Sequence, residues 1–321
     1  MHPGRPRNYG PWLVGLGAAL WGTESAWRIP LNELFDASVI VWWEHVLLVV
    51  MFLPFLLWHW RELRGLDGRT WSFLVFSAFA GSAVGTIFFT LALKTGNPTV
   101  VNVVLNIQPL ISTVGGVLLF GDQLSRRFFL FAPLAILAGV FLSVEHPGQI
   151  GVSFEKAGLN IGAGYALVCA LFWGLSTVAG RGVMTKMSVA LGASLRVMLG
   201  LVCMTGILLV QNKLQAPMLW PAAASSHRGT AMGSLALLTT LSGGVPLLIY
   251  FAGLRRTRAS TAGYFEMMQT LAAVVITWGF FHAGLRLHQV IAAFVLIAAA
   301  TMVQRVQAKV DAETTPLSPL S

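Results

Sequence analysis

The chain has 321 residues, of which 56% are hydrophobic and only 10% charged, and its formal net charge is +9. Soluble domains carry roughly 25% charged residues, so most of this chain must face lipid rather than water. The basic residues lie in short loops and form no single run, which argues against nucleic-acid binding. Cys169 and Cys203, each within an apolar stretch, provide neither a disulfide framework nor a metal-binding spacing.

Ten apolar segments of about bilayer-spanning length follow one another along the chain. They lie at 11–29, 38–59, 71–93, 98–120, 127–144, 158–180, 188–210, 229–252, 260–281 and 287–304. The first is too long for the apolar region of a signal peptide and lacks a clear cleavage site, so we expect it to be retained. The sequence therefore predicts an all-α fold, a polytopic membrane bundle of ten transmembrane helices, with a disordered cytoplasmic tail at 305–321.

Lys and Arg residues concentrate in alternate loops. If the N-terminus is cytoplasmic, the cytoplasmic segments hold most of the 21 basic residues, including Arg61, Arg64 and Arg69. The external segments hold few, and Arg28 is counted among them. The positive-inside rule then predicts that both termini lie in the cytoplasm. The expected location is the bacterial inner membrane, and the expected oligomeric state is a monomer or homodimer.

The two halves of the sequence resemble each other. ALWG at 19–22 recurs as LFWG at 171–174, and LALKTGNPT at 91–99 matches AGLRRTRAS at 252–260, at offsets of 152 and 161 positions. The longer connection at 211–228 accounts for the difference between these offsets. Each half contains five helices, an odd number, so the second half enters the membrane from the side opposite to the first. The halves 11–144 and 158–304 are therefore predicted to be two inverted five-helix repeats. Such repeats are typical of secondary transporters, with the substrate near the bilayer midplane.

These motifs resemble the drug/metabolite transporter superfamily, specifically its EamA-type ten-helix exporters. The resemblance also rests on SLRVMLG at 194–200 and on the segment at 92–125 that runs from ALKTGNPT to GDQLS, and it covers residues 11 to about 304. It implies a carrier that works by alternating access, often an exporter of amino acids or related compounds. The sequence departs from the family pattern at Glu44, where Arg is frequent, at Thr270 in place of proline, and at Ala283 in place of an acid.

Ionisable side chains within a membrane are costly, so each one needs a reason. Glu24 and Glu44 would both lie roughly 8–9 Å from the outer ends of their helices, at a rise of 1.5 Å per residue. They could share an outward-facing cavity with His45 and exchange protons there, as a proton-coupled exporter requires. Alternatively, each reaches the interface or bonds to the backbone. Arg196 and Glu266 have similar depths and could form a buried ion pair, either structural or acting as a gate.

Polar and aromatic side chains supply further candidates for contacts with substrate. Those in the first half are Trp21, Asn102, Asn106 and Gln108, which precedes Pro109; those in the second are Trp173, Tyr264 and Gln269. Pro109 would free a backbone carbonyl within its helix. The alternative is that the amides join helices and the tryptophans are packing residues. The GxxxG spacings at Gly81/Gly85, Gly158/Gly162 and Gly229/Gly233 predict close helix packing.

Other functional classes lack their motifs. Without GxxxxGK[ST], an ATP-driven pump is not expected, and no cofactor is predicted. Without GxSxG or HExxH, the scattered histidines do not indicate an intramembrane enzyme. A channel would need rings of like charge or a repeated filter. A lipid or drug flippase of the same architecture remains an alternative. The expected partners are therefore a small-molecule substrate, the lipid bilayer and protons as a coupling ion.

Overall fold

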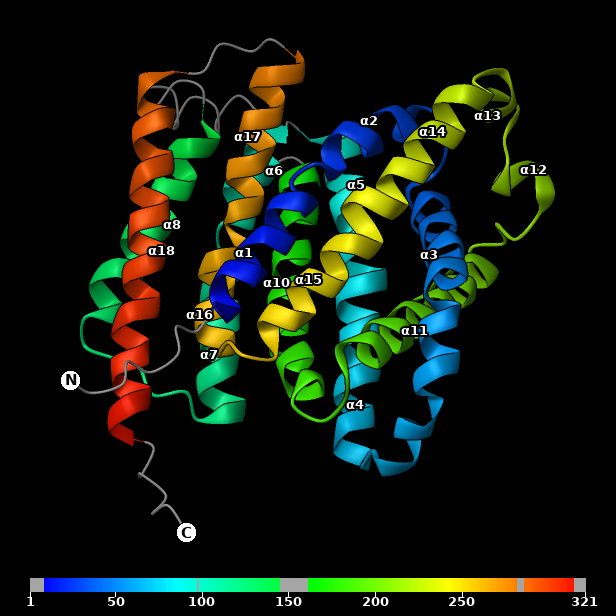
Figure 1. Ribbon diagram of the computed structural model, residues 1–321. Coiled ribbons are helices and arrows are strands. Elements are labelled where there is room, and N and C mark those ends of the chain that lie inside the picture. Colours follow the sequence, from blue (N-terminus) through cyan, green and yellow to red (C-terminus); the bar gives the residue numbers. More distant parts are fainter. Residues whose placement is uncertain (1–8, 97, 145–160, 282–285, 315–321) are drawn as a thin grey trace.

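The computed structural model describes residues 9–96, 98–144, 161–281 and 286–314, and over these ranges the chain is helical, with no strand (Figure 1). The prediction of an all-α protein is thus confirmed. Seven continuous stretches in these ranges are long and apolar enough to cross a membrane: Ala37–Gly65, Gly68–Thr95, Val100–Phe120, Ile161–Met184, Val189–Val210, Arg228–Leu254 and Leu287–Val310.

The helices follow the apolar segments of the sequence. The first half contains α1 (Gly10–Trp21), α2 (Glu24–Leu34), α3 (Ala37–His59), the 3-10 helix η1 (Trp60–Gly65), α4 (Gly68–Ser77), the π-helix η2 (Ala78–Val84), α5 (Gly85–Thr95), α6 (Pro98–Leu105), α7 (Gln108–Phe120) and α8 (Phe128–Ser143). The second half contains α10 (Ile161–Met184), α11 (Val189–Val210), α12 (Ala216–Leu219), α13 (Ala222–Ser226), α14 (Arg228–Thr239), the π-helix η4 (Thr240–Gly244), α15 (Val245–Leu254), α16 (Ala259–Glu266), α17 (Met268–Phe281) and α18 (Leu287–Thr314).

Interruptions divide several helices near their middles. Helices α6 and α7 are separated at Asn106 and Ile107, where Pro109 cannot donate a hydrogen bond to the carbonyl of Leu105. Helices α16 and α17 are separated at Met267, 161 positions after Asn106. The two π-helices η2 and η4 lie at this same offset. These interruptions thus recur at the spacing that relates the two halves of the sequence. The predicted helix 11–29 is also divided, between α1 and α2 at Gly22 and Thr23, but α10 is continuous at the corresponding positions.

Two predicted helix ends are wrong. The first helix was expected to stop at residue 29, but α2 continues to Leu34, so Arg28 lies within a helix and not in an external loop. The tail was expected to be disordered from residue 305, but α18 continues to Thr314. Gln307 anchors this extension by donating to the carbonyl of Gln123 at 3.0 Å and accepting from the backbone N–H of Ser125 at 2.9 Å.

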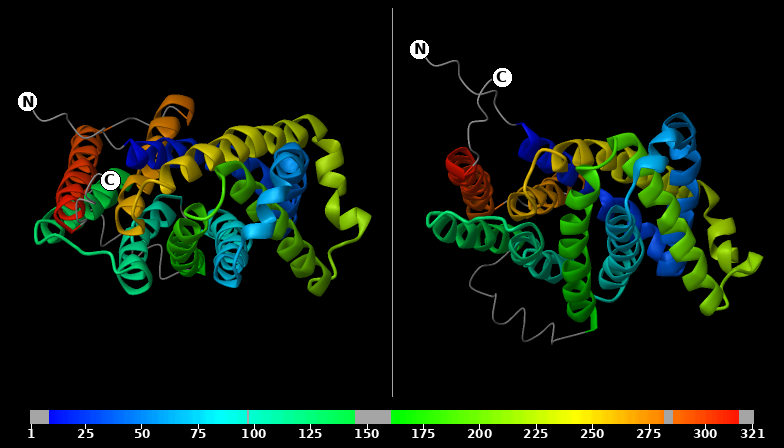
Figure 2. Two further views of the ribbon diagram at one scale, coloured as in Figure 1. Left: turned by 60° about the horizontal axis from the view of Figure 1, so that its bottom comes forward. Right: turned by 90° about the horizontal axis from the view of Figure 1, so that it is seen from below.

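Helices from the two halves pack against one another in matching pairs. Helix α1 packs along α15, and α10 packs along α5 (Figure 2). Helix α3 pairs with α11, and α8 pairs with α18, its equivalent at the far end of the second half. The halves therefore interlock rather than forming two separate bundles.

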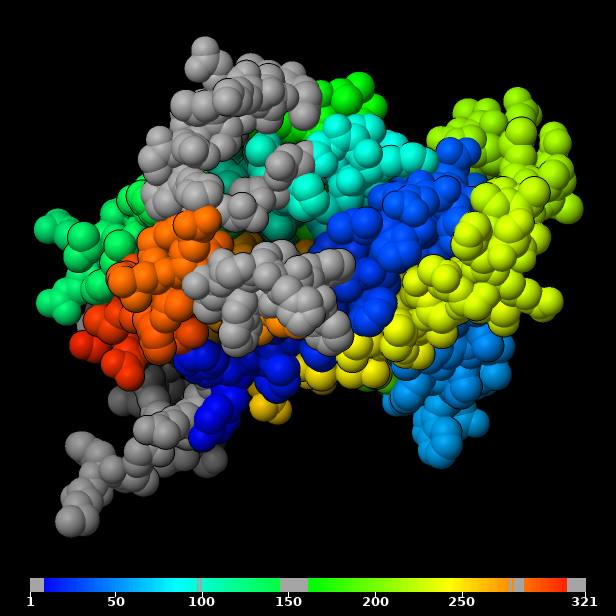
Figure 3. Space-filling model, turned by 90° about the horizontal axis from the view of Figure 1, so that it is seen from above, coloured from blue at the N-terminus to red at the C-terminus, as the bar shows by residue number. Residues whose placement is uncertain are grey.

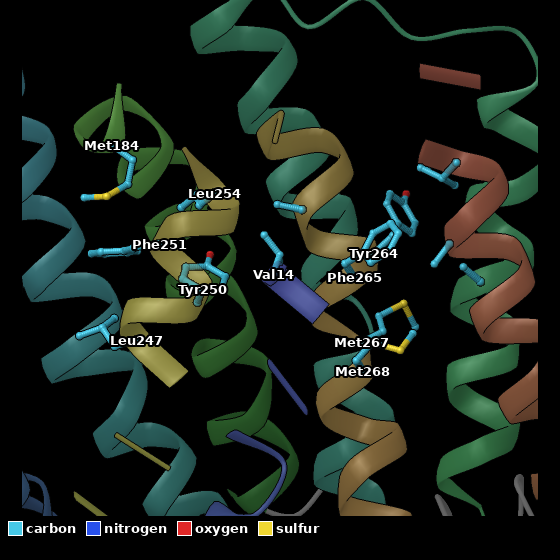
Figure 4. Close-up of a cluster of buried hydrophobic side chains, with 14 of the residues drawn as sticks. Val14, Met184, Leu247, Tyr250, Phe251, Leu254, Tyr264, Phe265, Met267 and Met268 are labelled. Atoms are coloured by element: carbon cyan, nitrogen blue, oxygen red, sulfur yellow. The ribbon is translucent and has the colours of Figure 1, made fainter. Parts of the chain in front are cut away.

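The largest apolar cluster extends from α8 and α18 through α16, α1 and α15 to α11 and α3, and Figure 4 shows part of it. Val14, Phe251 and Phe265 are buried there. Tyr264, a predicted substrate contact, belongs to this core: its ring is fully buried and lies edge-on to Phe128, with centroids 5.5 Å apart. Tyr264 is two residues from Glu266, and neighbours at that spacing point to different sides of a helix.

Close helix packing depends on glycines where α1 meets α15. A methyl group on Gly253 would lie 2.5 Å from the backbone nitrogen of Val14 and 2.6 Å from the carbonyl oxygen of Gly10, whereas one on Gly233 would meet nothing within 4 Å. We therefore expect Gly253→Ala to lower the free energy of unfolding by about 1–3 kcal/mol. Gly233→Ala should raise it by up to about 1 kcal/mol through helix propensity.

Denaturation of both variants in mild detergent measures this contrast, and equal effects of the two substitutions on the free energy of unfolding would contradict it.

The space around each glycine also tests the predicted close packing at the GxxxG spacings. Gly81 and Gly85 are tightly packed against Ser176 and Trp173, as predicted. Gly229 and Gly233 have open space around them, so the prediction of close packing there is wrong. Gly158 lies outside the described residues.

Candidate functional site

A cavity lined by ionisable, polar and aromatic side chains lies among helices of both halves, with a solvent-accessible volume of about 90 Å³. This volume holds several water molecules, so a larger solute requires the walls to move apart. Its charged, polar and aromatic lining includes Trp21, Glu24, Arg28, Glu44, His45, Ser82, Thr86 and Gln108 from the first half, and Trp173, Ser176, Thr177, Arg196, Ser242, Tyr250, Glu266 and Gln269 from the second. The structure thus brings together nearly all the predicted ionisable and aromatic candidates.

Arg28 organises one side of the cavity. Its side chain is fully buried, and its Nε donates to Oε2 of Glu24 at 2.9 Å while Nη2 donates to Oε2 of Glu44 at 2.7 Å. Nη1 donates to Oγ1 of Thr90 at 3.2 Å. Glu24 and Glu44 share one cavity, as predicted, but Arg28, which was expected in an external loop, bridges them. The sequence did contain a clue to this ion pair, because residues four apart on one helix, such as Glu24 and Arg28, lie on the same face.

Glu266 occupies another side of the cavity and is surrounded by neutral donors. Its Oε1 accepts from the hydroxyl of Tyr250 at 2.7 Å and from Oγ1 of Thr177 at 2.8 Å. Its Oε2 accepts from the side-chain amide of Gln108. Glu266 is the last residue of α16, directly before the interruption between α16 and α17. Its carboxyl group contacts side chains of α7, α10 and α15.

The predicted ion pair between Arg196 and Glu266 is not formed. Arg196 donates from Nε to Oγ of Ser82 at 2.9 Å, and its guanidinium lies over the ring of Phe251, 5.4 Å from the centroid. No salt bridge in the described part of the chain includes either Arg196 or Glu266. Each of the two side chains contacts neutral partners instead. The cavity therefore presents a cation and a carboxyl group that can each receive a further partner.

Aromatic pairs related by the two sequence offsets border the cavity. The rings of Trp21 and Tyr250 have centroids 4.6 Å apart, and those of Trp173 and Phe89 are 5.0 Å apart. Trp21 corresponds to Trp173 in the repeat, and Phe89 to Tyr250. Each half therefore packs its tryptophan against an aromatic residue of the other half. The indole N–H of Trp173 also donates to the carbonyl of Gly81 at 3.2 Å.

The remaining candidates divide between the cavity and helix contacts. His45 lines the cavity, and its Nδ1 lies 2.8 Å from the carbonyl oxygen of Val41, which orients the ring. Asn106 donates to Ser143 at 3.2 Å and accepts from Thr270 at 3.3 Å, as the helix-contact alternative expects.

Asn102 and Asn106 line a smaller adjoining pocket, and Gln108, Glu266 and Gln269 line both this pocket and the main cavity. Over the described ranges, no group of three or more His, Cys, Asp or Glu side chains is arranged to hold a metal ion. The side chains that line the main cavity carry guanidinium, carboxyl, imidazole, amide, hydroxyl and aromatic groups.

Comparison with known proteins assigns this architecture to a class. The model of the EamA-like transporter family matches residues 8–144 and 160–305, so the chain belongs to this family. It is a multi-pass membrane transporter, as the resemblance in its motifs implied.

One curated relative is the riboflavin transporter ImpX of Fusobacterium nucleatum, which is 27% identical over 183 residues. The match spans 56% of this chain and 60% of that protein, so it leaves a large part of each unmatched. A solved chain described only as the crystal structure of a protein has a TM-score of 0.70 at 16% identity. That similarity covers 95% of this chain and 99% of the other, and it shows a shared fold.

Proposed function

We propose that this protein is a secondary active transporter with ten membrane-spanning segments in two inverted five-helix repeats, at 11–144 and 158–304. Three further segments join the seven long apolar helices in this arrangement: α1 with α2, α8, and α16 with α17. The two separate matches to the family support it, as do the equal lengths of α6 and α16 at an offset of 161. Both termini are cytoplasmic in this proposal, as the loop charges favour.

The central cavity is the proposed site of alternating access. The observation that carries this proposal is that each half contributes a tryptophan and ionisable groups to one cavity among apolar helices, with each tryptophan packed against an aromatic ring of the other half. Rocking of one half against the other would expose such a cavity to each side in turn. The transport direction proposed is export, driven by protons that the carboxyl group of Glu266 exchanges.

The substrate proposed is a small metabolite with a planar aromatic part and polar edges. Trp21 and Trp173 offer ring faces, while the amides of Gln108 and Gln269 offer donors and acceptors. Riboflavin has this chemistry, and the name of the curated relative makes it the first compound to test. Arg196 and Glu266, which are opposite in charge and not paired with each other, favour an amino acid or related zwitterion as the second candidate.

Counterflow in proteoliposomes tests this proposal. Vesicles preloaded with unlabelled riboflavin or with an amino-acid mixture are diluted into a labelled trace of the same compounds. A carrier gives transient accumulation of its substrate that exceeds equilibrium, whereas a channel shows no such acceleration. A flippase would instead move fluorescent phospholipid between leaflets. Absence of counterflow for all tested metabolites, together with lipid movement, would contradict the proposal.

The tryptophans should affect apparent affinity. We expect Trp21→Ala and Trp173→Ala each to raise the half-saturating substrate concentration about ten-fold, because an aromatic contact contributes roughly 0.5–1.5 kcal/mol beyond the area it buries. Trp58→Ala is the matched control, since that side chain is 85% exposed on the apolar surface. Equal changes in all three variants would show that the effect is not specific to the cavity.

A further inference from the structure

A second, apolar groove lies away from the central cavity. It is formed by α3, α13 and α14 with the turn after α12, has a volume of about 550 Å³, and is lined chiefly by Trp43, Leu47, Trp220, Met232 and Leu235, with Arg228 as its one charged residue. These elements lie at one edge of the molecule, where the blue of α3 meets the yellow-green of α12 to α14 (Figures 1 and 3). The transport cycle proposed above makes no use of it.

The connection at 211–228, which has no equally long counterpart in the first half, builds this groove. The indole N–H of Trp43 donates to the carbonyl of Leu219 at 2.8 Å, which holds the end of α12 against α3. The ring of Trp220 lies edge-on to Trp43 and to Phe35, with centroid distances of 6.0 and 5.4 Å. The groove is therefore held by specific contacts and is not a chance gap between mobile loops.

The groove has a polar end and an apolar end. Lys213 and Asp36 form a salt bridge at 3.0 Å near the start of α3 and are partly exposed, which marks the water-facing side. Trp43 is six residues into α3, or roughly 9 Å, and Ala236 is eight residues into α14, or roughly 12 Å. Arg228, at the first residue of α14, therefore lies at headgroup depth while the rest of the groove extends into the hydrocarbon region.

The charge at the polar end has the sign that an anionic headgroup requires. Arg228 is exposed, and no salt bridge within the described ranges includes it. No carboxylate lines the groove, and no side chain caps the N-terminus of α14, whose dipole also favours an anion. Tryptophans such as Trp43 and Trp220 are typical of the membrane interface.

We propose that this groove binds an anionic phospholipid, with one acyl chain along Leu47, Met232 and Ala236 and the phosphate at Arg228. A second protein molecule would find little to pair with in a groove of this shape that carries a single rim charge. A zwitterionic lipid such as phosphatidylcholine also carries a phosphate, but its choline cation offsets that charge, so its headgroup would be attracted to Arg228 less strongly than that of an anionic lipid. The site is separate from the substrate cavity and does not depend on which metabolite is transported.

Photo-crosslinking in nanodiscs tests the site. The full chain is placed in discs that contain a trace of phosphatidylglycerol with a diazirine in its acyl chain, and labelled peptides are mapped after irradiation. Phosphatidylcholine carrying the same diazirine serves as the neutral probe. We expect labelling by phosphatidylglycerol to concentrate on residues 43–47 and 228–236.

Two variants separate the contributions of charge and shape. Arg228→Gln should lower phosphatidylglycerol labelling of the groove about five-fold, since a basic residue near a membrane contributes about that factor, and should change phosphatidylcholine labelling little. Ala236→Trp should fill the groove and reduce labelling by both probes. Arg127→Gln, at the exposed start of α8, and Val202→Trp, on the exposed face of α11, are the matched controls.

The proposal is overturned if both lipids label the groove equally in the wild type, or if labelling is spread evenly over the apolar surface. It is also overturned if Ala236→Trp leaves the labelling unchanged. Labelling that disappears as the protein concentration in the discs rises would instead identify a contact between two copies of the chain.

Discussion

Replacing Arg28 with methionine is expected to lower the free energy of unfolding by about 3–5 kcal/mol, a larger loss than we expect for Gly253→Ala. The reason is that Arg28 is the shared counter-ion of Glu24 and Glu44, and all three side chains are buried. Without it, two buried carboxyl groups are left with no cation in contact. Chemical denaturation in mild detergent, followed by tryptophan fluorescence, measures the loss.

Removing all three charges together provides the decisive control. The triple variant Arg28→Met, Glu24→Gln, Glu44→Gln should recover most of the stability, because a neutral network lacks the uncompensated charge. Arg127→Met, at an exposed position, should change the free energy of unfolding by no more than about 0.5 kcal/mol. If Arg28→Met unfolds at the wild-type denaturant concentration, the buried ionic network does not stabilise the fold.

Replacing Glu266 with glutamine is expected to reduce transport driven by a proton gradient at least about ten-fold, a factor equivalent to ~1.4 kcal/mol, while counterflow continues. Glu266 is bonded only to neutral donors, so its ionisation is not tied to a cation in contact with it. Glutamine keeps an acceptor for Tyr250 and Thr177 but cannot exchange a proton. Parallel assays of gradient-driven transport and counterflow in the same proteoliposomes measure this difference.

The control is a carboxyl group away from the cavity. Asp36→Asn removes an acid whose side chain is 56% exposed and should leave both assays unchanged. Equal loss of counterflow and driven transport in Glu266→Gln would show that Glu266 binds substrate and does not couple protons.

Because Arg28 forms ion pairs with Glu24 and Glu44, we expect Glu24→Gln to affect stability more than the pH dependence of transport. The sequence alone had suggested that Glu24 and Glu44 exchange protons.

Much of the fold was predictable because hydropathy reports the solvent around each segment. The long apolar helices lie close to their expected positions, and Pro109 marks the interruption between α6 and α7. The interruption at Met267 has no proline beside it, since Thr270 stands at the equivalent position, so only the repeat could suggest it. The first helix was predicted too short because Arg28 and Asn32 suggest a helix end, although both are buried within α2.

The site was predictable as a set of residue types but not as a set of contacts. Charged residues are rare in the apolar segments, and this alone identified Glu24, Glu44, Arg196 and Glu266 as candidate site residues. All four line the cavity. Their partners were not predictable, because Arg196 bonds to Ser82, 114 positions away, and Glu266 bonds to Gln108, 158 positions away. Such pairings depend on how helices from the two halves interlock, which local periodicity does not record.

The buried charge of Arg28 also has a consequence for how the protein is made. A stretch that carries a guanidinium and a carboxyl group partitions poorly into lipid on its own, and neither α1 nor α2 is among the seven long apolar helices. Glu24 lies one turn from Arg28, but Glu44 arrives only when α3 has been synthesised. We therefore expect the insertion machinery to release the first segment together with α3, as a hairpin, and a chain truncated after α2 to integrate less efficiently than one truncated after α3.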